Sequence, residues 1–420
     1  MQTSDIIKQY GAQSLESLAL QLSSQHHPQA AYILQQVEGW QRLRMKVPSW
    51  AAIEGLQYPP RLALEQCSGE AAAQYKLQVV KQLFPDGGNE MVDLTGGLGV
   101  DFSFMARNFK WATYVEQQEE LCRLARHNFP LLKLQHAHVI CGDGEDYLRQ
   151  MDRRVDLIFL DPARRDGAGK KTVLIEDCRP DVCVLCSLLL EKAHYVVVKL
   201  SPMLDIAESV RSLGCVEQVC VFATGGECKD LLLVLSPKAK DDGREPLIYV
   251  SENGISLSFR LSEERCAEVS YATQMDNYLF EPGPALLKAG AFRWVAARYG
   301  LKKLHPNSHL YTSEREVEDF PGRSFRVKQV YGFGKQDLKN LRSEVTRANL
   351  TVRNFPASVD VLRKKLKIKD GGEEFIFVTT MADNQHVIVR CEKTRRKNDD
   401  LCVTFFSLTR LLNREPNEKD

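Results

Sequence analysis

The sequence lacks an apolar run long enough to cross a membrane. Its longest apolar stretch, from Val182 to Leu190, is interrupted by Ser187 and falls short of the about 20 residues that a bilayer requires. The first residues contain no basic segment followed by an apolar one, so we expect no signal peptide and a cytoplasmic location. The 420 residues suggest two to four domains.

The cysteines lack the spacing of a metal site. There are 12 of them, but the only C-x-x-C pair, Cys183 and Cys186, lies in an apolar stretch without a second pair or a nearby histidine. We therefore expect buried thiols there, no metal, and no disulfide framework.

The net charge is only +1, yet one segment is strongly basic. Residues 321–369 contain 13 Lys and Arg against three acids, an excess of ten positive charges. A basic segment in a neutral chain is typical of a module that binds a polyanion, and we favour a nucleic acid as its partner over a merely solvated face.

The apolar pattern changes along the chain. Residues 1–75 show helical spacing, and a helix capped by Ser68 is expected to follow. Short apolar strands then alternate with helices, which predicts an α/β fold whose parallel sheet is covered on both faces and ends in an antiparallel hairpin. The expected strands cover 91–94, 112–116, 137–141, 155–161, 194–200, 216–223 and 229–236, with a helix over 177–191. A linker is expected at KAKDDG, after Pro237.

Glycines and acids follow the expected strands at their carboxyl ends, where such sheets bind ligands. The glycine turn after the first strand contains Asp93, Thr95, Gly96, Gly97 and Gly99, without the G-x-G-x-x-G spacing of a dinucleotide enzyme. Acids also end the next three strands, with Glu116 placed to accept ribose hydroxyls, Asp143 beside Gly142 to accept an adenine amine, and Asp161 after the fourth. Any single acid could be a helix N-cap, but four together with the glycine turn indicate a nucleoside site.

These motifs resemble those of class I S-adenosylmethionine-dependent methyltransferases. DLTGGLGVD resembles motif I, GDGED the adenine-contacting motif, and DPARR, with Asp161, Pro162 and Arg164, motif IV. The whole chain resembles bacterial methyltransferases that carry a THUMP-like C-terminal domain. This resemblance implies a Rossmann-like catalytic domain, S-adenosyl-L-methionine as cofactor and an RNA-binding THUMP-like domain.

The resemblance implies the following order of domains. A helical region covers 1–75, the methyltransferase domain 76–240, a β-hairpin with a small ferredoxin-like region 241–318, the basic α+β THUMP-like domain 319–395, and a tail 396–420.

The atom that is methylated stays open. Motif IV lacks the second proline and the aromatic residue typical of exocyclic amine methylation, and no cysteine follows the fifth strand to support methylation at uracil C5. The set Lys76, Asp161, Lys199 and Glu227 resembles the tetrad of some ribose 2′-O-methyltransferases, where a lysine held near neutrality could accept the hydroxyl proton. Arg164 and Arg165 could grip a phosphate or pair with acids such as Asp166.

The function predicted from the sequence is methylation of rRNA or tRNA, at a base nitrogen or a ribose 2′-hydroxyl. A methyltransferase acting on DNA or a small molecule is one alternative. A cofactor-binding RNA chaperone or ribosome-assembly factor with little catalysis is another.

Overall fold

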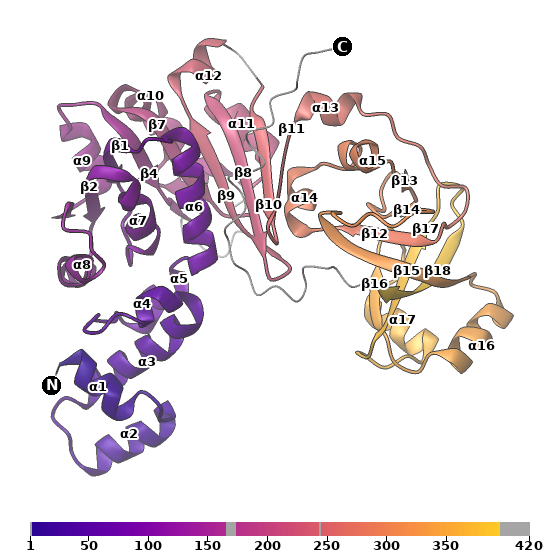
Figure 1. Ribbon diagram of the computed structural model, residues 1–420, viewed down its shortest axis with the longest axis horizontal. Coiled ribbons are helices and arrows are strands. Elements are labelled where there is room, and N and C mark those ends of the chain that lie inside the picture. The colour runs from indigo at the N-terminus through magenta and orange to yellow at the C-terminus, as the bar shows by residue number, and fades with distance from the viewer. Residues whose placement is uncertain (1, 165–173, 243–244, 395–420) are drawn as a thin grey trace. The chain divides into compact units, whose positions relative to one another are not determined.

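A computed structural model describes residues 2–164, 174–242 and 245–394. The chain divides into two compact units, one containing residues 1–224 and 228–248, the other 225–227 and 249–420 (Figure 1). Among the described residues no helix is long and apolar enough to cross a membrane, and no group of three or more His, Cys, Asp or Glu could hold a metal ion.

The first unit begins with a helical region. Ile6, Leu18, Leu22, Ile33 and Val37 form its core, since the apolar residues recur at helical spacing on the faces that meet. The helices are α1 (Thr3–Tyr10), α2 (Leu15–Ser24), α3 (Ala30–Lys46), α4 (Pro48–Ala51), α5 (Arg61–Gln66) and α6 (Glu70–Leu83).

A twisted sheet follows, in which the order of the first unit's strands is β8-β9-β7-β4-β1-β2-β3. The pairs between β3, β2, β1, β4 and β7 are parallel, whereas β9 is antiparallel to β7. The parallel strands therefore end at one edge of the sheet, which is where ligands bind in such folds. These strands are β1 (Gly88–Asp93), β2 (Phe109–Glu116), β3 (Ala137–Cys141), β4 (Val155–Leu160), β7 (Ala193–Leu200), β8 (Val216–Thr224) and β9 (Glu227–Leu235).

Helices connect these strands, as alternation of strand and helix requires. They are α7 (Val100–Met105), α8 (Glu119–Leu131), α9 (Gly144–Gln150), α10 (Val182–Lys192) and α11 (Ile206–Leu213), with a short 3₁₀ turn η1 (Ala106–Asn108). Two short antiparallel strands, β5 (Ala163–Arg164) and β6 (Cys178–Arg179), and a 3₁₀ turn η2 (Ile175–Asp177) precede α10.

The second unit contains a mixed sheet in the order β13-β14-β12-β15-β18-β17-β16. Helices α16 and α17 pack their apolar sides against it, through Leu341, Leu362 and Leu366 over Ile376 and Ile388. The sheet strands are β12 (Tyr278–Pro282), β13 (Lys302–Lys303), β14 (Tyr311–Ser313), β15 (Gly322–Tyr331), β16 (Asn349–Val352), β17 (Glu374–Thr380) and β18 (His386–Lys393). The helices are α13 (Leu261–Cys266), α14 (Pro284–Ala289), α15 (Trp294–Tyr299), α16 (Lys335–Glu344) and α17 (Val359–Leu366).

The chain passes from the first unit to the second within β10 (Leu247–Glu252), which is followed by β11 (Ile255–Arg260). Asn253 and Gly254 between them both have positive φ, as a two-residue hairpin turn requires.

Four details differ from the expectations. The predicted linker after Pro237 contains helix α12 (Pro237–Asp242). Helix α10 begins at Val182 rather than at residue 177, because proline at 180 disfavours helix at the preceding residue and Asp181 caps the new start by accepting from Cys183 N at 3.1 Å. The Cys183 and Cys186 side chains are half-buried rather than buried.

The fourth difference concerns Ser68, which the sequence predicts as the cap of α6. The N-cap is Gly69, which makes no side-chain cap hydrogen bond. The hydroxyl of Ser68 donates instead to Asp101 at 2.7 Å, because a buried carboxylate is a stronger acceptor than solvent.

Candidate active site

Three glycines shape the turn from β1 into α7. Gly97 and Gly99 have φ of 58° and 81°, in the left-handed region that favours glycine. Gly96 is needed for a different reason, because a Cβ there would lie 2.3 Å from the ring of Tyr114. The Tyr114 hydroxyl donates a hydrogen bond to Gly97 O, so the turn is packed closely against β2.

Asp93 ends β1 and is almost completely buried, with 1% of its surface exposed. Its Oδ1 accepts from Thr95 N at 2.9 Å, and the Thr95 Oγ1 in turn accepts from Asp161 N at 2.7 Å. Burial raises the pKa of Asp93 to about 8, although the hydrogen bonds from Thr95 oppose this. The ends of β1 and β4 are thus joined through Thr95.

Glu116 and Asp143 lie at the ends of β2 and β3. Glu116 accepts backbone hydrogen bonds from Gly97 N and Gln118 N, both at 2.8 Å. Asp143 is the N-cap of α9, and its side chain accepts from the backbone N–H groups two and three residues later at 2.8 and 3.0 Å. A Cβ at Gly142 would meet nothing within 4 Å, so the chain beside Asp143 is open.

A network of buried charges lies next to this turn. Lys76 of α6 is completely buried and contacts Asp230 of β9 and Asp101, the latter at 3.1 Å. Lys199 of β7 contacts Asp101 at 3.6 Å and Asp161 at 2.5 Å. The exposed fraction of the side chains rises from 0% at Lys76 through 14% at Lys199 to 40% at Asp161. The network therefore leads from the core to a partly open carboxylate.

The pKa directions distinguish the members of the network. Burial alone would lower the pKa of Lys199, but the carboxylates of Asp161 and Asp101 outweigh it and raise this pKa. Burial would also raise the pKa of Asp101, but Lys76 and Lys199 lower it. Burial raises the pKa of Asp161, against the opposing effect of Lys199. Lys199 is thus held as an ammonium, opposite to a lysine held near neutrality, because two carboxylates lie beside it.

The structure brings together most of the residues predicted at the site. Lys76, Asp161 and Lys199 belong to one network, whereas the acid of β9 that contacts Lys76 is Asp230, three positions after the predicted Glu227. Glu227 itself is exposed at the start of β9. Pro162 is buried, the backbone of Arg164 pairs with Cys178, and Arg165, Asp166 and the tail 396–420 lie outside the described residues.

Sequence reasoning missed Ser68, Asp101 and Asp230. Asp230 carried a usable signal, because a charge directly before the apolar run LLLVL is costly to bury without a partner. Asp101 directly follows the glycine turn, but only the fold shows that it faces Lys76 and Lys199.

The fold and the chemistry of this edge define a class. A doubly wound sheet with an antiparallel strand β9 beside β7, and with a glycine turn and carboxylates at the ends of its parallel strands, is the arrangement of S-adenosylmethionine-dependent methyltransferases. The chain is 22% identical over 319 residues to S-adenosylmethionine-dependent methyltransferases named as uncharacterized from two strains of Mycobacterium tuberculosis, covering 76% of this chain and 83% of theirs.

The C-terminal part and one solved structure define the family more narrowly. Family models described as a ferredoxin-like domain and a THUMP domain-like region match residues 278–321 and 322–393. The crystal structure of a proposed methyltransferase from Porphyromonas gingivalis W83 is 37% identical, with a TM-score of 0.81, covering 94% of this chain and 98% of that one. The chain belongs to this family of S-adenosylmethionine-dependent methyltransferases with a THUMP-like C-terminal domain.

Proposed function

We propose that this methyltransferase acts on RNA, at a base nitrogen or a ribose 2′-hydroxyl. The observation that carries this proposal is that, in residues 321–369, the arginines pair with groups of the protein whereas most of the lysines do not. All six arginines there donate hydrogen bonds to protein groups, and Lys328 is paired with Glu374 and Glu392. The arginines are Arg323, Arg326, Arg342, Arg347, Arg353 and Arg363.

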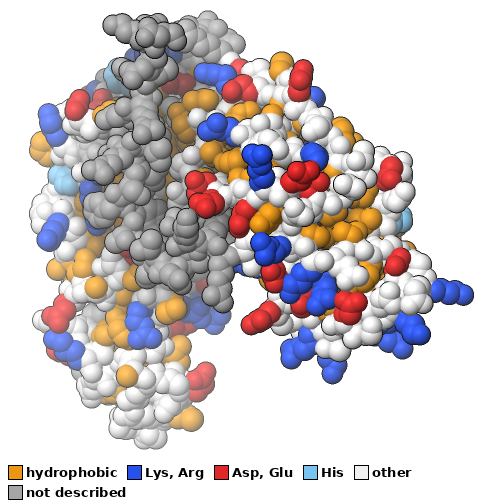
Figure 2. All heavy atoms as spheres, turned by 45° about the vertical axis from the view of Figure 1, so that its right-hand side comes forward, with side chains coloured by type: hydrophobic (Ala, Val, Ile, Leu, Met, Phe, Trp, Pro, Cys, Tyr) orange, Lys and Arg blue, Asp and Glu red, His pale blue; other side chains and the backbone are white. Residues whose placement is uncertain are grey.

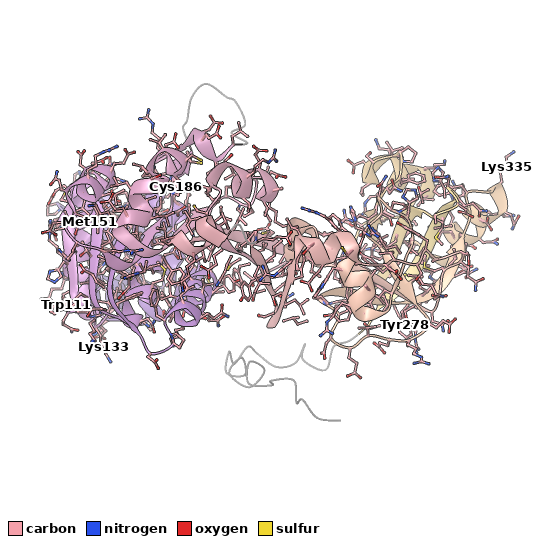
Figure 3. All side chains as sticks on the ribbon, turned by 90° about the horizontal axis from the view of Figure 1, so that it is seen from above. Trp111, Lys133, Met151, Cys186, Tyr278 and Lys335 are labelled. Carbon is pink, nitrogen blue, oxygen red and sulfur yellow. The ribbon has the colours of Figure 1, made fainter. Side chains whose placement is uncertain are left out.

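The other six lysines of the segment are exposed, and among the described residues their ammonium groups have no hydrogen bond or ion pair. They are Lys335, Lys339, Lys364, Lys365, Lys367 and Lys369. Lys and Arg side chains gather toward the lower right of Figure 2, on the second unit, and Lys335 extends outward in Figure 3. Unpaired lysines on a THUMP-like domain suit the phosphates of RNA, whose neutralisation dominates such binding.

The proposed cofactor residues match the chemical groups of S-adenosylmethionine. Asp93 would hold the ammonium of the methionine moiety, because a buried carboxyl with a raised pKa gains most from a neighbouring cation. Glu116 would accept the ribose hydroxyls, since each of its oxygens accepts one backbone N–H and keeps a second lone pair.

The rest of the cofactor site completes this match. Asp143 would accept from the adenine amine beside the open Gly142, and the turn of Thr95, Gly96, Gly97 and Gly99 would let the backbone approach the ligand closely. When bound, the cofactor supplies a methyl group on a cationic sulfur.

Asp161 is the group that we assign to the target. It is the most exposed carboxylate of the network and can accept a hydrogen bond and then a proton from the target amine or hydroxyl. Lys199 is fixed as an ammonium and orients Asp161, while Thr95 fixes its backbone. In this assignment the proton acceptor is an aspartate and not a lysine.

The direct test is methyl transfer to RNA. Tritiated S-adenosylmethionine is incubated with the protein and total RNA from a strain in which its gene is deleted. We expect acid-precipitable label that ribonuclease releases, and nucleoside analysis then separates base from ribose methylation. Label resistant to ribonuclease would indicate another substrate. Cofactor binding without any transfer would favour the assembly factor over the enzyme acting on RNA.

A further inference from the structure

A cluster of rings lies at one end of the sheet in the second unit. Phe333 follows β15, Phe355 follows β16, and His386 begins β18. The rings of Phe333 and Phe355 stack with centroids 5.0 Å apart and 17° between their planes. His386 meets Phe355 edge-on at 4.7 Å, and its Nδ1 lies 3.1 Å from Thr380 Oγ1, which orients the imidazole.

A lysine covers the outer side of this cluster. The Nζ of Lys365 lies 5.4 Å from the centroid of Phe333, within the range of a cation–π contact. Its backbone is fixed, because Arg342 of α16 donates to Lys365 O at 2.6 Å. Its side chain is exposed and makes no ion pair with a described residue, so only a weak contact holds the ammonium over the ring.

Core packing accounts for part of this arrangement but not for all of it. Phe333 and Phe355 are partly buried against the apolar cluster below α16 and α17. His386 and Lys365, however, are exposed, and neither adds apolar area to that cluster. Phe333 is also flanked by Gly332 and Gly334, which leaves its ring without neighbouring side chains along the chain.

We propose that this cluster binds an unpaired nucleotide of the RNA substrate, a step that rests on the proposed function above. The base stacks on Phe333 in the place where the Lys365 ammonium now lies, and the ammonium moves to the phosphate of the same nucleotide. Aromatic rings beside a cationic surface are what single-stranded RNA requires, because an unpaired base offers its face for stacking. A base inside a duplex is already stacked on both sides and cannot do this.

The surrounding charges extend the site along the strand. Lys364 and Lys367 flank Lys365 on α17 and the turn after it, and Lys335 begins α16 two residues after Phe333. These exposed lysines give neighbouring phosphates a positive surface near the ring, and neither phosphate contacts nor stacking reads the identity of a base. The site therefore selects for an unpaired strand more than for a sequence.

The test uses the full chain and a short single-stranded RNA that contains one 2-aminopurine, whose fluorescence falls when its base stacks on an aromatic ring. We expect the protein to quench this fluorescence on binding, and the same strand annealed to its complement to bind more weakly. Phe333→Leu keeps an apolar side chain but removes the ring, and we expect it to weaken binding about fivefold or more and to reduce the quenching. Trp111→Leu is the matched control, since it removes an exposed ring of the first unit, and binding should stay unchanged.

A second variant keeps the test decisive if Phe333→Leu alters folding. Lys365→Glu changes only an exposed side chain and should weaken binding of the single strand without changing the melting temperature. Equal binding by the wild type and both variants would overturn the nucleotide site, and so would tighter binding of the duplex. Methyl transfer to RNA by the wild type in the same experiments would show that the proposed function stands even where this site fails.

Discussion

The two units use buried and exposed charge in opposite ways. In the first unit, Lys76 and Lys199 lie among three aspartates, and no more than 14% of either lysine side chain is exposed. In the second, every arginine of residues 321–369 is held by a protein group, while six lysines point to solvent without a partner among the described residues. Paired charges fix geometry, whereas unpaired charges remain available to a ligand, so charge count alone does not locate a binding surface.

The largest effect on turnover should come from Asp161, the partly exposed end of the buried network. We expect Asp161→Asn to lower kcat about 100- to 10,000-fold, because the amide keeps the shape but cannot accept a proton. Cofactor binding, measured by calorimetry, should persist. Wild-type turnover by this variant would remove Asp161 from the role of proton acceptor.

A somewhat smaller loss is expected at Lys199. In Lys199→Ala the burial that raises the pKa of Asp161 loses its strongest opposing charge, so this pKa should rise further. Transfer should fall about 100-fold at neutral pH, with the acidic limb of the pH profile shifted to higher pH. Cofactor affinity should stay the same, and Lys199→Arg should restore part of the rate. Normal transfer by the alanine variant would show that Lys199 has no role in methyl transfer.

Lys76, at the buried end of the network, should contribute to the stability of the fold rather than to turnover. Removing Lys76 by Lys76→Met leaves Asp230 buried without its cation, which should lower the free energy of unfolding by about 3–5 kcal/mol. Lys8→Met is the matched control, because Lys8 forms an exposed pair with Glu54 worth about 0–1 kcal/mol. Denaturant unfolding of both variants measures the difference, and equal effects would show that burial of the pair is not decisive.

The pH dependence of cofactor affinity should reveal Asp93. Its carboxyl has a pKa of about 8 in the folded chain, above its ordinary value, so it is protonated at neutral pH before the cofactor binds. A cationic amine requires the ionised form, so affinity should rise with pH by at most about tenfold per unit and level off above about 8.

The Asp93 carboxyl also determines how the stability of the ligand-free protein changes with pH. The folded state holds this proton more tightly than the unfolded state, so the contribution of Asp93 is greatest below the unfolded pKa and declines as pH rises toward 8. Asp93→Asn should flatten both profiles. A pH-dependent affinity that persists in this variant would assign the titration to another group.

The smallest expected effect distinguishes lysines from arginines in the second unit. Lys364→Ala combined with Lys367→Ala should reduce the slope of log affinity for single-stranded RNA against log salt by about 0.7 for each phosphate that the protein no longer neutralises. Arg353→Ala should leave this slope unchanged and lower stability, because Arg353 pairs with the buried carboxylate of Glu281 at 2.9 Å. An equal change of slope in both variants would remove the contrast between the two residue types.

The sheet was predictable because its strands are short apolar runs in regular alternation with helices. The strand expected over 137–141 has the same bounds in the structure, and the glycine turn lies where β1 ends. The predicted start of α10 is too early, because Pro180 disfavours helix at the residue before it and Asp181 caps a helix that begins at Val182. The spacing of apolar residues predicts which helices and strands exist. It does not predict the residue at which a helix begins, because local groups such as a proline or a capping side chain decide that.

The site was predictable in part, for a related reason. Acids at strand ends could be located one by one, since parallel strands end at a common edge. The partner of Lys76 could not, because Asp230 lies 154 residues away and reaches it only through the insertion of β9 beside β7. Nothing in the sequence indicates that the arginines of the basic segment donate their hydrogen bonds to groups of the protein itself.

The insertion of β9 beside β7 has a consequence for the order in which the first unit assembles during synthesis. A nascent chain that has emerged only through β7 contains Lys76, Asp101 and Lys199, two cations with a single carboxylate between them and Asp161 at the far end. The second carboxylate for Lys76 arrives with β9, so helix α6 cannot reach its final environment until about half of the chain has left the ribosome. Contacts this distant in sequence also slow folding, so the innermost ion pair should be among the last features of the catalytic domain to form.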